Sequence, residues 1–322
     1  MEIKTQISST FRDIEAEKGT TALCKIVLES LSDCLNTFRA KDQDDFIEQF
    51  KNLALMIKST KPRMGIVIYY ICEIWDKLED KKDKLISTVK IKDYLRKVIQ
   101  DLQKEIITDS EKVKRNGCQH ITDGDVILIH SHSKTVMDII EKAKKKGKKF
   151  KIVVAEQENE KTLDIIKFLN KKGITFYVVP EFMLSHIEEE ITKVFLGGLT
   201  FNDKHYFITD AGTNSVVAEF HGIKIPIYIF LTTTKFALWI SSEEHSRNKV
   251  KQLKSCKSLK ECLTYERIKF SHDRISISAI YCLVTEEGNY NQEEAKKLFK
   301  SKFNQRKKWH EKHFGEASKV GA

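Results

Sequence analysis

The sequence predicts an α/β protein in which an N-terminal helical domain precedes a doubly wound, Rossmann-like domain with a mostly parallel sheet. Apolar residues recur at spacings of three and four through the first 120 residues, as they do in amphipathic helices. From residue 126, short apolar runs alternate with helical stretches, which is typical of parallel strands joined by helices. We expect a helical domain over 1–120, an α/β domain over 121–300 and a basic tail over 301–322.

The first part is expected to contain several helices that share one core. One apolar stripe is continuous enough to predict a long, two-sided helix, and Val89 belongs to that stripe. Breaks are expected where proline or glycine interrupts the pattern. The expected helical segments are Leu23 to Phe38, Phe46 to Ile57, 66–78 and 83–114, and the expected breaks are KPRMG (61–65) and RNGCQHITDGD (115–125).

The second part should carry its functional residues where strands end, because doubly wound folds bind ligands at the carboxyl ends of parallel strands. Strands are expected in VILIH (126–130), FKIVVA (150–155), ITFYVV (174–179), KVFLGG (193–198) and IPIYIF (225–230), with Gly147 and Gly173 at helix ends. The residues that follow them are His130 to Ser133, Glu156 to Glu158, Pro180 and Glu181, Gly197 to Leu199, and Leu231 to Lys235.

The chain is basic, with 56 Lys and Arg residues against 46 Asp and Glu residues and a net charge of +10. Part of the excess lies in EKAKKKGKKFK (141–151) and SKFNQRKKWHEKHF (301–314). This balance suits nucleic acid or an acidic protein as a partner. Lysines at helix ends are commonly solvated, however, so composition alone selects no partner.

Cysteine usage indicates a reducing compartment. The seven cysteines are scattered, odd in number and form no CxxC pair, which argues against a disulfide framework and a zinc ribbon. Residues 1–30 show neither a signal peptide nor a transit peptide, and no stretch approaches the roughly 20 apolar residues that span a bilayer. We expect a cytoplasmic protein without membrane contact.

DVILIHSHSKTV (125–136) raises the question of a metal site. His130 and His132 would lie on one face of an extended chain, as metal ligands do. Glu156 or Glu181 could join them from another strand end, but no familiar ligand spacing supports a further ligand. We expect no metal ion.

Two small-residue motifs are expected to cap helices. A nucleophilic serine would need a positioned base and there is no GxSxG turn, so Ser133 is better explained as an N-cap. In AGTNS (211–215), Gly212 opens a helix whose free N–H groups suit a phosphate, but capping by Thr213 and Asn214 explains the motif equally. No dinucleotide or P-loop fingerprint occurs, and no cofactor is expected.

Five motifs occur in order: DVILIHSHSKTV, FKIVVAEQENE, KVFLGGLTF, ITDAGTNSVVAEFHGIKIPIYIFLTTTKF and RIKFSHDRISISAIYCLVTEEGNYNQEEAKKLF. This set resembles the regulatory subunits of eukaryotic translation initiation factor 2B and their relatives, the ribose bisphosphate and methylthioribose-1-phosphate isomerases. The resemblance covers roughly residues 45 to 300.

The resemblance implies a noncatalytic member. The isomerases use a cysteine after the His of the first motif and an aspartate after the Gly-Ala of the third, where this chain has Ser131 and Leu199. A serine hydroxyl is a far weaker acid than a thiol, and leucine transfers no proton. Glu158 replaces an arginine suited to phosphate. The expected degenerate ligand pocket comprises His130, Ser131, His132, Ser133, Glu156, Gly197, Leu199, Gly212, Thr213, Asn214 and Lys235.

The resemblance also implies partners. We expect an alpha-like subunit, lacking the long extension of delta, of the guanine nucleotide exchange factor for initiation factor 2. It would bind sister subunits, form a homodimer through its α/β domain and help to sense the phosphorylated alpha subunit of initiation factor 2. Candidates for the dimer interface are Phe236, Leu238 and Trp239 in FALWI (236–240), with core packing as the alternative, and candidates for partner binding are Lys58, Lys61 and Arg63.

Two other functions stay open from the sequence. One is an enzyme, either a sugar-phosphate isomerase or an unrelated hydrolase that uses Ser131 with a histidine. The other is a basic RNA-binding module led by residues 301–322, whose affinity would fall steeply with salt. A noncatalytic member could still hold a residual sugar phosphate in its pocket.

Overall fold

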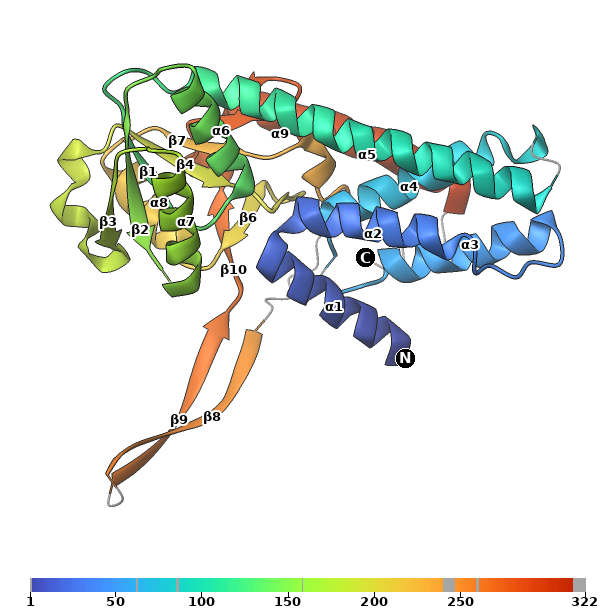
Figure 1. Ribbon diagram of the computed structural model, residues 1–322, viewed down its shortest axis with the longest axis horizontal. Coiled ribbons are helices and arrows are strands. Elements are labelled where there is room, and N and C mark those ends of the chain that lie inside the picture. The colour runs from blue at the N-terminus through green and yellow to red at the C-terminus, as the bar shows by residue number, and fades with distance from the viewer. Residues whose placement is uncertain are drawn as a thin grey trace.

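One long helix, α5 (Thr88–Gln119), connects the two parts of the molecule, with the other N-terminal helices at one end and the main sheet at the other (Figure 1). The computed structural model describes residues 2–61, 63–84, 87–157, 159–239, 247–258 and 261–314. Within these ranges it describes all side chains except those of 2–4, 159–160, 247–258, 261–269 and 308–314. No described helix combines the length and apolarity that a membrane crossing requires.

The N-terminal helices pack around a core of their own, as the periodicity predicts. Phe46 and Phe50 from one helix and Trp75 from another lie in this core, together with an apolar stripe of α5 that includes Leu95 and Ile106. Phe50 stacks on Trp75 with ring centroids 6.3 Å apart. The N-terminal elements are α1 (Glu2–Lys18), α2 (Thr20–Cys34), α3 (Gln43–Lys58), α4 (Gly65–Glu79) and the 3₁₀ turn η1 (Lys82–Lys84).

The predicted bounds of the long helix were wrong at both ends. Ser87 caps α5 by accepting a hydrogen bond from the Lys90 N–H at 3.3 Å, so the helix starts five residues after the predicted position. Val89, predicted to belong to the apolar stripe, is 66% exposed. The helix continues through Gly117, where a β-carbon would lie 2.5 Å from Ile139 Cδ1. That glycine therefore admits close packing instead of ending the helix.

The second part is built on a seven-stranded, mostly parallel sheet with strand order β12-β11-β7-β4-β1-β2-β3, which confirms the predicted fold class. Alternate residues of β1 enter cores on opposite faces, Ile127 and Ile129 on one and Leu128 on the other. The strands are β1 (Val126–Ile129), β2 (Lys151–Glu156), β3 (Phe176–Pro180), β4 (Lys193–Gly197), β7 (Ile227–Phe230), β11 (Cys282–Val284) and β12 (Asn289–Tyr290).

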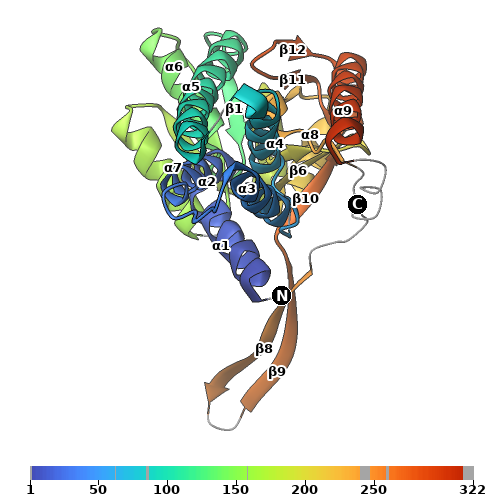
Figure 2. The same ribbon diagram turned by 90° about the vertical axis from the view of Figure 1, so that its right-hand side faces the viewer.

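Helices cover both faces of this sheet (Figure 2). The end of α5 packs with α6 and α7 over one face, and α8 and α9 pack over the other. The covering helices are α6 (Lys134–Lys145), α7 (Asn159–Lys171), α8 (Thr213–Gly222) and α9 (Gln292–Phe314). The 3₁₀ turns of this part are η2 (Glu181–His186), η3 (Glu188–Glu190), η4 (Thr233–Lys235) and η5 (Ile277–Ala279).

Two antiparallel elements were not predicted. A three-stranded sheet of order β10-β6-β5 lies beside α8, and a two-stranded ribbon, β8–β9, projects from the body (Figure 1). Their bounds are β5 (Thr200–Phe201), β6 (Tyr206–Asp210), β8 (Arg247–Ser258), β9 (Glu261–Phe270) and β10 (His272–Ser276).

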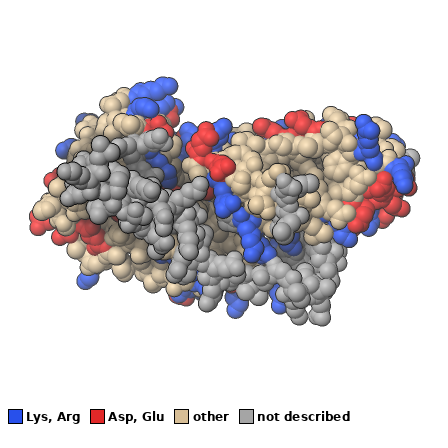
Figure 3. Space-filling view, turned by 90° about the horizontal axis from the view of Figure 1, so that it is seen from below, with Lys and Arg blue, Asp and Glu red and all other residues tan. Residues whose placement is uncertain are grey.

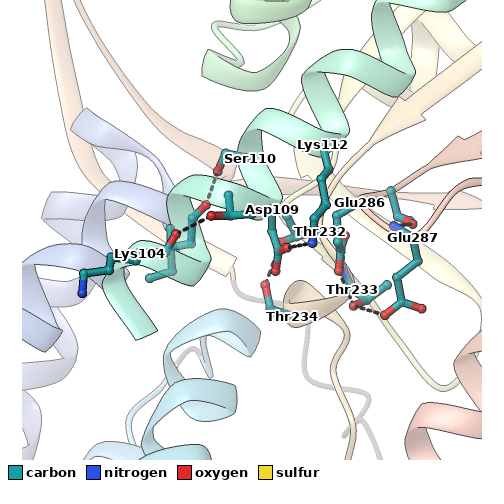
Figure 4. Close-up of polar contacts among 12 residues, drawn as sticks. Lys104, Asp109, Ser110, Lys112, Thr232, Thr233, Thr234, Glu286 and Glu287 are labelled. Carbon is teal, nitrogen blue, oxygen red and sulfur yellow. Dashed lines mark hydrogen bonds and ion pairs between the residues drawn. The ribbon is translucent and has the colours of Figure 1, made fainter. Parts of the chain in front are cut away.

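The two parts meet where η4 rests on the start of α4. A β-carbon on Gly65 would lie 2.8 Å from the Lys235 carbonyl oxygen, so only glycine allows this approach. Figure 4 shows how η4 is held from the other side: both carboxylate oxygens of Glu286 accept from the Thr233 N–H at 3.0 Å, and the Thr233 hydroxyl also donates to Glu286. Burial raises the pKa of Glu286.

Candidate functional site

The chain turns sharply just after β1, in the first motif. Ser131 has φ +66°, in the left-handed region that non-glycine residues seldom adopt. His130 is therefore buried at 1% exposure, whereas His132 is exposed. The prediction that the two histidines share one face of an extended chain was wrong, because the strand ends at Ile129.

His130 is the centre of a polar network at the carboxyl ends of three adjacent strands. Its Nδ1 lies 3.0 Å from Thr213 Oγ1, and its Nε2 lies 3.3 Å from Glu181 Oε2 and 2.8 Å from Gln157 Nε2. Gly212 closes the cluster: a β-carbon there would lie 3.0 Å from Glu181 Oε2 and 3.1 Å from His130 Nε2.

The hydrogen bond of Thr213 to Asp210 determines which nitrogen of His130 carries a proton. The Thr213 hydroxyl donates to the Asp210 carbonyl at 2.6 Å, so its single proton is used and His130 Nδ1 must donate to Thr213 Oγ1. The Gln157 amide N–H₂ then donates to His130 Nε2, and it also lies 3.2 Å from the Ala211 carbonyl. Both ring nitrogens are engaged, which leaves no lone pair for a metal ion. In the described part of the chain, no group of three or more His, Cys, Asp or Glu residues could hold one.

Ser133 caps α6, as predicted. Its Oγ accepts from the Val136 N–H at 3.4 Å. The same side chain occupies the space beside Gly197, where a β-carbon would lie 2.1 Å from Ser133 Oγ. Gly197 and Ser133 are thus brought together by packing between the ends of β1 and β4.

The N-terminus of α8 is capped differently from the prediction. Gly212 is the N-cap, with φ +94°, and no side-chain cap bond forms at this position. The hydroxyl of Thr213 turns toward His130, and Asn214 is exposed with its N–H donating to Asp273 Oδ2 at 2.9 Å. A carboxylate therefore already occupies one N–H group that a bound phosphate would need.

Lys235 is buried between the two parts of the molecule at 7% exposure. Its Nζ donates to the Gly198 carbonyl at 3.4 Å, which places it near the third motif. Burial lowers the pKa of Lys235 to about 8, an effect opposed by Glu15 and Cys24. The lysine is held against the core instead of extending into solvent.

The remaining pocket candidates hold no described polar contact to His130. Leu199 is half-buried, and its N–H donates to the Ile208 carbonyl at 2.9 Å. Glu156 ends β2 opposite Pro180, and Glu158 lies outside the described residues. The sequence alone indicated Gln157 only as a residue after a strand and Glu181 as a possible metal ligand, and it did not indicate Asp210, which pairs with Lys161 at 3.2 Å.

The dimer candidates divide between core and surface. Phe236 is 1% exposed and packs in the core, so the alternative of core packing is correct for it and it presents no anchor to a second subunit. Leu238 and Trp239 are half-buried, and Ile240 of the same motif lies outside the described residues. Exposed apolar residues lie elsewhere: Phe182 is 82% exposed and Met183 is 45% exposed, just after the edge strand β3.

The basic residues predicted to bind partners lie in different surroundings. Lys58 and Arg63 line one pocket with Trp239, whereas Lys61 is exposed outside it. Residues 301–314, expected to begin a tail, continue α9. Lys302 pairs with Glu287, and Arg306 pairs with Glu73 at 2.9 Å, so this stretch is docked on the body.

Comparison with known proteins places this geometry in context. The model of the initiation factor 2 subunit family, IF-2B, matches residues 16–292. An eIF-2B subunit 2-like protein of Pyrococcus furiosus is 29% identical over 154 residues, which are 46% of this chain and 56% of that protein. The eIF2B delta subunit of Schizosaccharomyces pombe is 32% identical over 160 residues, 49% of this chain and 33% of that subunit. This chain thus spans a third to about half of the length of these relatives.

Isomerases also match. The ribose 1,5-bisphosphate isomerase of Pyrococcus furiosus is 23% identical over 239 residues, 72% of this chain and 71% of that enzyme.

Solved structures share the fold. The eIF-2B of Pyrococcus horikoshii superposes with TM-score 0.69 at 20% identity, covering 88% of this chain and 96% of that one. A chain of the tetrameric eIF2B beta2-delta2 complex of C. thermophilum gives 0.70 at 15% identity, covering 91% and 93%. The 5-methylthioribose 1-phosphate isomerase of Pyrococcus horikoshii gives 0.68 at 12% identity, covering 92% and 88%.

Replacing the buried lysine should stabilise the chain. Because the pKa of Lys235 falls from 10.5 to about 8 on folding, the folded state below pH 8 carries a protonated amine in the core. We expect Lys235→Met to raise the free energy of unfolding at neutral pH by about 1 to 3 kcal/mol, measured by urea denaturation.

The pH dependence of this difference in the free energy of unfolding tests whether the pKa of Lys235 is lowered on folding. Between about pH 8 and 10.5 the Lys235 amine is protonated in the unfolded wild type but not in the folded one. The free energy of unfolding of the wild type therefore rises with pH in this range, and the difference in favour of Lys235→Met becomes smaller. The exposed Lys144→Met serves as control and should show neither effect. A Lys235→Met advantage that stays constant across this range would contradict the assignment.

Proposed function

This chain belongs to the initiation factor 2 subunit family, IF-2B, and on that premise we propose that it is a noncatalytic regulatory subunit of the guanine nucleotide exchange factor for initiation factor 2. The proposal is carried by the resemblance of the first and third motifs to those of the isomerases, which puts Ser131 and Leu199 at the acid and base positions. The contacts of His130 support it, because Thr213 and Gln157 engage both of its ring nitrogens.

Neither side chain can move a proton between sugar carbons. Leucine has no titratable group, and a serine hydroxyl needs a base to act. Both nitrogens of the neighbouring His130 are engaged elsewhere. The pocket that remains would at most hold a residual sugar phosphate without converting it.

Within the family, the position of the subunit in the assembly is part of the proposal. An alpha-like role was expected, and the match to delta subunits makes a delta-like role the main alternative. In either role the chain would bind sister subunits in the cytoplasm and help to sense phosphorylated initiation factor 2 alpha. The complex of related beta and delta subunits supports such pairing.

Pairing with a second copy through the α/β domain is also proposed. Phe182 and Met183 are better anchors than Phe236, because they are exposed beside an edge strand and large apolar side chains dominate interface energies. A homodimer built this way would cover both side chains.

Sedimentation velocity across a concentration series tests this pairing. We expect the wild type to be a dimer. The double variant Phe182→Ser, Met183→Ser should have a dimer dissociation constant about tenfold or more above that of the wild type, since buried aromatic anchors contribute about 2 kcal/mol or more. Ile107→Ser, an exposed apolar residue of α5, is the matched control and should sediment as the wild type. A monomeric wild type at all concentrations would refute the homodimer.

A sugar-phosphate isomerase is the second candidate, because an isomerase matches over most of both chains. The pure protein is incubated with ribose 1,5-bisphosphate or methylthioribose-1-phosphate, and product is followed by NMR. We expect no turnover above the rate without protein, since the chain lacks the acid and base. Turnover that is lost in Ser131→Ala would establish the enzyme and overturn the noncatalytic role.

A further inference from the structure

The ribbon formed by β8 and β9 projects from the body of the molecule in both side views (Figure 1, Figure 2). Strand β8 has 12 residues, so at the usual rise of an antiparallel strand the ribbon is about 40 Å long. Strand β9 ends one residue before β10, and β10 pairs with β6 from His272 to Ser276. The base of the ribbon is therefore attached to a strand that the body holds in place.

The two strands of the ribbon are strongly basic. Residues 247–258 and 261–270 include seven Lys and Arg residues against two Glu residues, whereas the whole chain has 56 basic residues against 46 acidic ones. Strand β8 has no acidic residue at all. The basic residues are Arg247, Lys249, Lys251, Lys254, Lys257, Arg267 and Lys269.

The register of the two strands places cations on both faces of the ribbon. Residues that pair across the ribbon share a face, and successive residues along a strand alternate between faces. Each of the four pairs nearest the body contains one basic residue, and these pairs are Arg247 with Phe270, Asn248 with Lys269, Lys249 with Ile268 and Val250 with Arg267. Arg247 and Lys249 thus lie on one face, and Arg267 and Lys269 lie on the other.

Aromatic residues are interleaved with these cations. Phe270 is 50% exposed and pairs with Arg247. Tyr265 lies on the same face as Arg267, two residues before it along β9. Alternating cations and aromatic rings suit single-stranded nucleic acid, because its phosphates attract the cations and its bases stack on the rings.

Two other basic stretches, 141–151 and 301–314, make contacts with the body. Lys148 donates to the Cys118 carbonyl at 2.8 Å, and Lys302 and Arg306 of α9 each pair with a glutamate. On the side from which the ribbon projects, basic side chains of the body form a strip near the middle of the view, with acidic side chains at one end of it (Figure 3). This side of the molecule therefore carries positive charge beyond the ribbon itself.

We propose that the β8–β9 ribbon binds single-stranded RNA, with its basic residues along the phosphate backbone and with Tyr265 and Phe270 at positions for base stacking. Cations on both faces favour a flexible strand over an acidic protein, because a folded surface meets one face of a ribbon whereas a single strand can follow both. Of the two nucleic acids, RNA is the one that a member of an initiation factor family meets.

This inference goes beyond the proposed function and does not depend on assembly with sister subunits. It is tested on the full chain alone, so a failure to bind RNA is distinct from a failure to join a complex.

Fluorescence anisotropy with a labelled single-stranded RNA is the direct measurement. The RNA has mixed sequence and about 20 nucleotides, more than the roughly 4 to 16 that one single-strand site covers. We expect saturable binding by the wild type. Lys249→Gln and Lys269→Gln, on opposite faces, should each raise the dissociation constant about tenfold, because each removes a charge-assisted contact to phosphate.

The salt dependence tests whether these contacts are to phosphates. Each phosphate neutralised on a single strand contributes about 0.7 to the slope of log affinity against log salt, so the double variant Lys249→Gln, Lys269→Gln should have a slope shallower by about 1.4. Lys249→Arg, Lys269→Arg keeps both charges and should bind with the wild-type slope. An effect of only one of the two faces would contradict a strand that follows both.

A matched double variant controls for net charge. Lys144→Gln, Lys171→Gln removes the same charge from exposed lysines of α6 and α7, and it should bind RNA as the wild type does. An equal loss of affinity in this control would show that only the total charge matters and would overturn the assignment to the ribbon.

The aromatic contribution is separable from the charge. Phe270→Leu keeps an apolar side chain but removes the ring, so the affinity should fall about tenfold while the salt slope stays the same. An unchanged affinity would contradict base stacking at this position.

Polyglutamate distinguishes RNA from an acidic polypeptide. It should compete poorly with RNA at equal charge, because it offers no bases for stacking. Equal competition would identify an acidic polypeptide as the partner and overturn the proposal, as would the absence of RNA binding by the wild type.

Discussion

The close packing of η4 on α4 is the constraint on which the arrangement of the two parts depends. At Gly65 the backbone of one part approaches the backbone of the other so closely that a single methyl group would force them apart. Glu286 holds η4 from the opposite side through Thr233. Because Lys235 ends η4 and Phe236 follows it, this contact also fixes the buried amine near Gly198 and the position of Phe236 in the core.

The polar network around His130 lies at positions where doubly wound folds bind ligands. His130, Gln157, Thr213 and Asp210 are joined by hydrogen bonds, and Glu181 lies within 3.3 Å of the same ring. These contacts link the ends of three strands. A histidine whose two nitrogens are both hydrogen-bonded is poorly suited to act as a base, which requires a free lone pair.

Local patterns were sufficient for five strands of the main sheet, β1, β2, β3, β4 and β7, and for helices α2 to α5, because apolar periodicity reports burial directly. The short strands β11 and β12 and the first helix, α1, were not among the predicted segments. Ser133 was also predictable, since a cap depends on residues three positions apart. Pairing between distant segments could not be predicted from local patterns. Strand β6 pairs with β10 across more than 60 residues, and Thr213 contacts His130 across a sequence separation of 83 residues. Gly117 misled the prediction because a glycine that admits a neighbouring side chain looks like a glycine that ends a helix.

The most direct test of the central claim is purification of the tagged chain from its native cells, with identification of the proteins that accompany it by mass spectrometry. A noncatalytic assembly subunit should bring down sister subunits of initiation factor 2B in fixed proportion, together with initiation factor 2. Recovery of the chain alone, or with enzymes of sugar-phosphate metabolism in place of those subunits, would contradict the account.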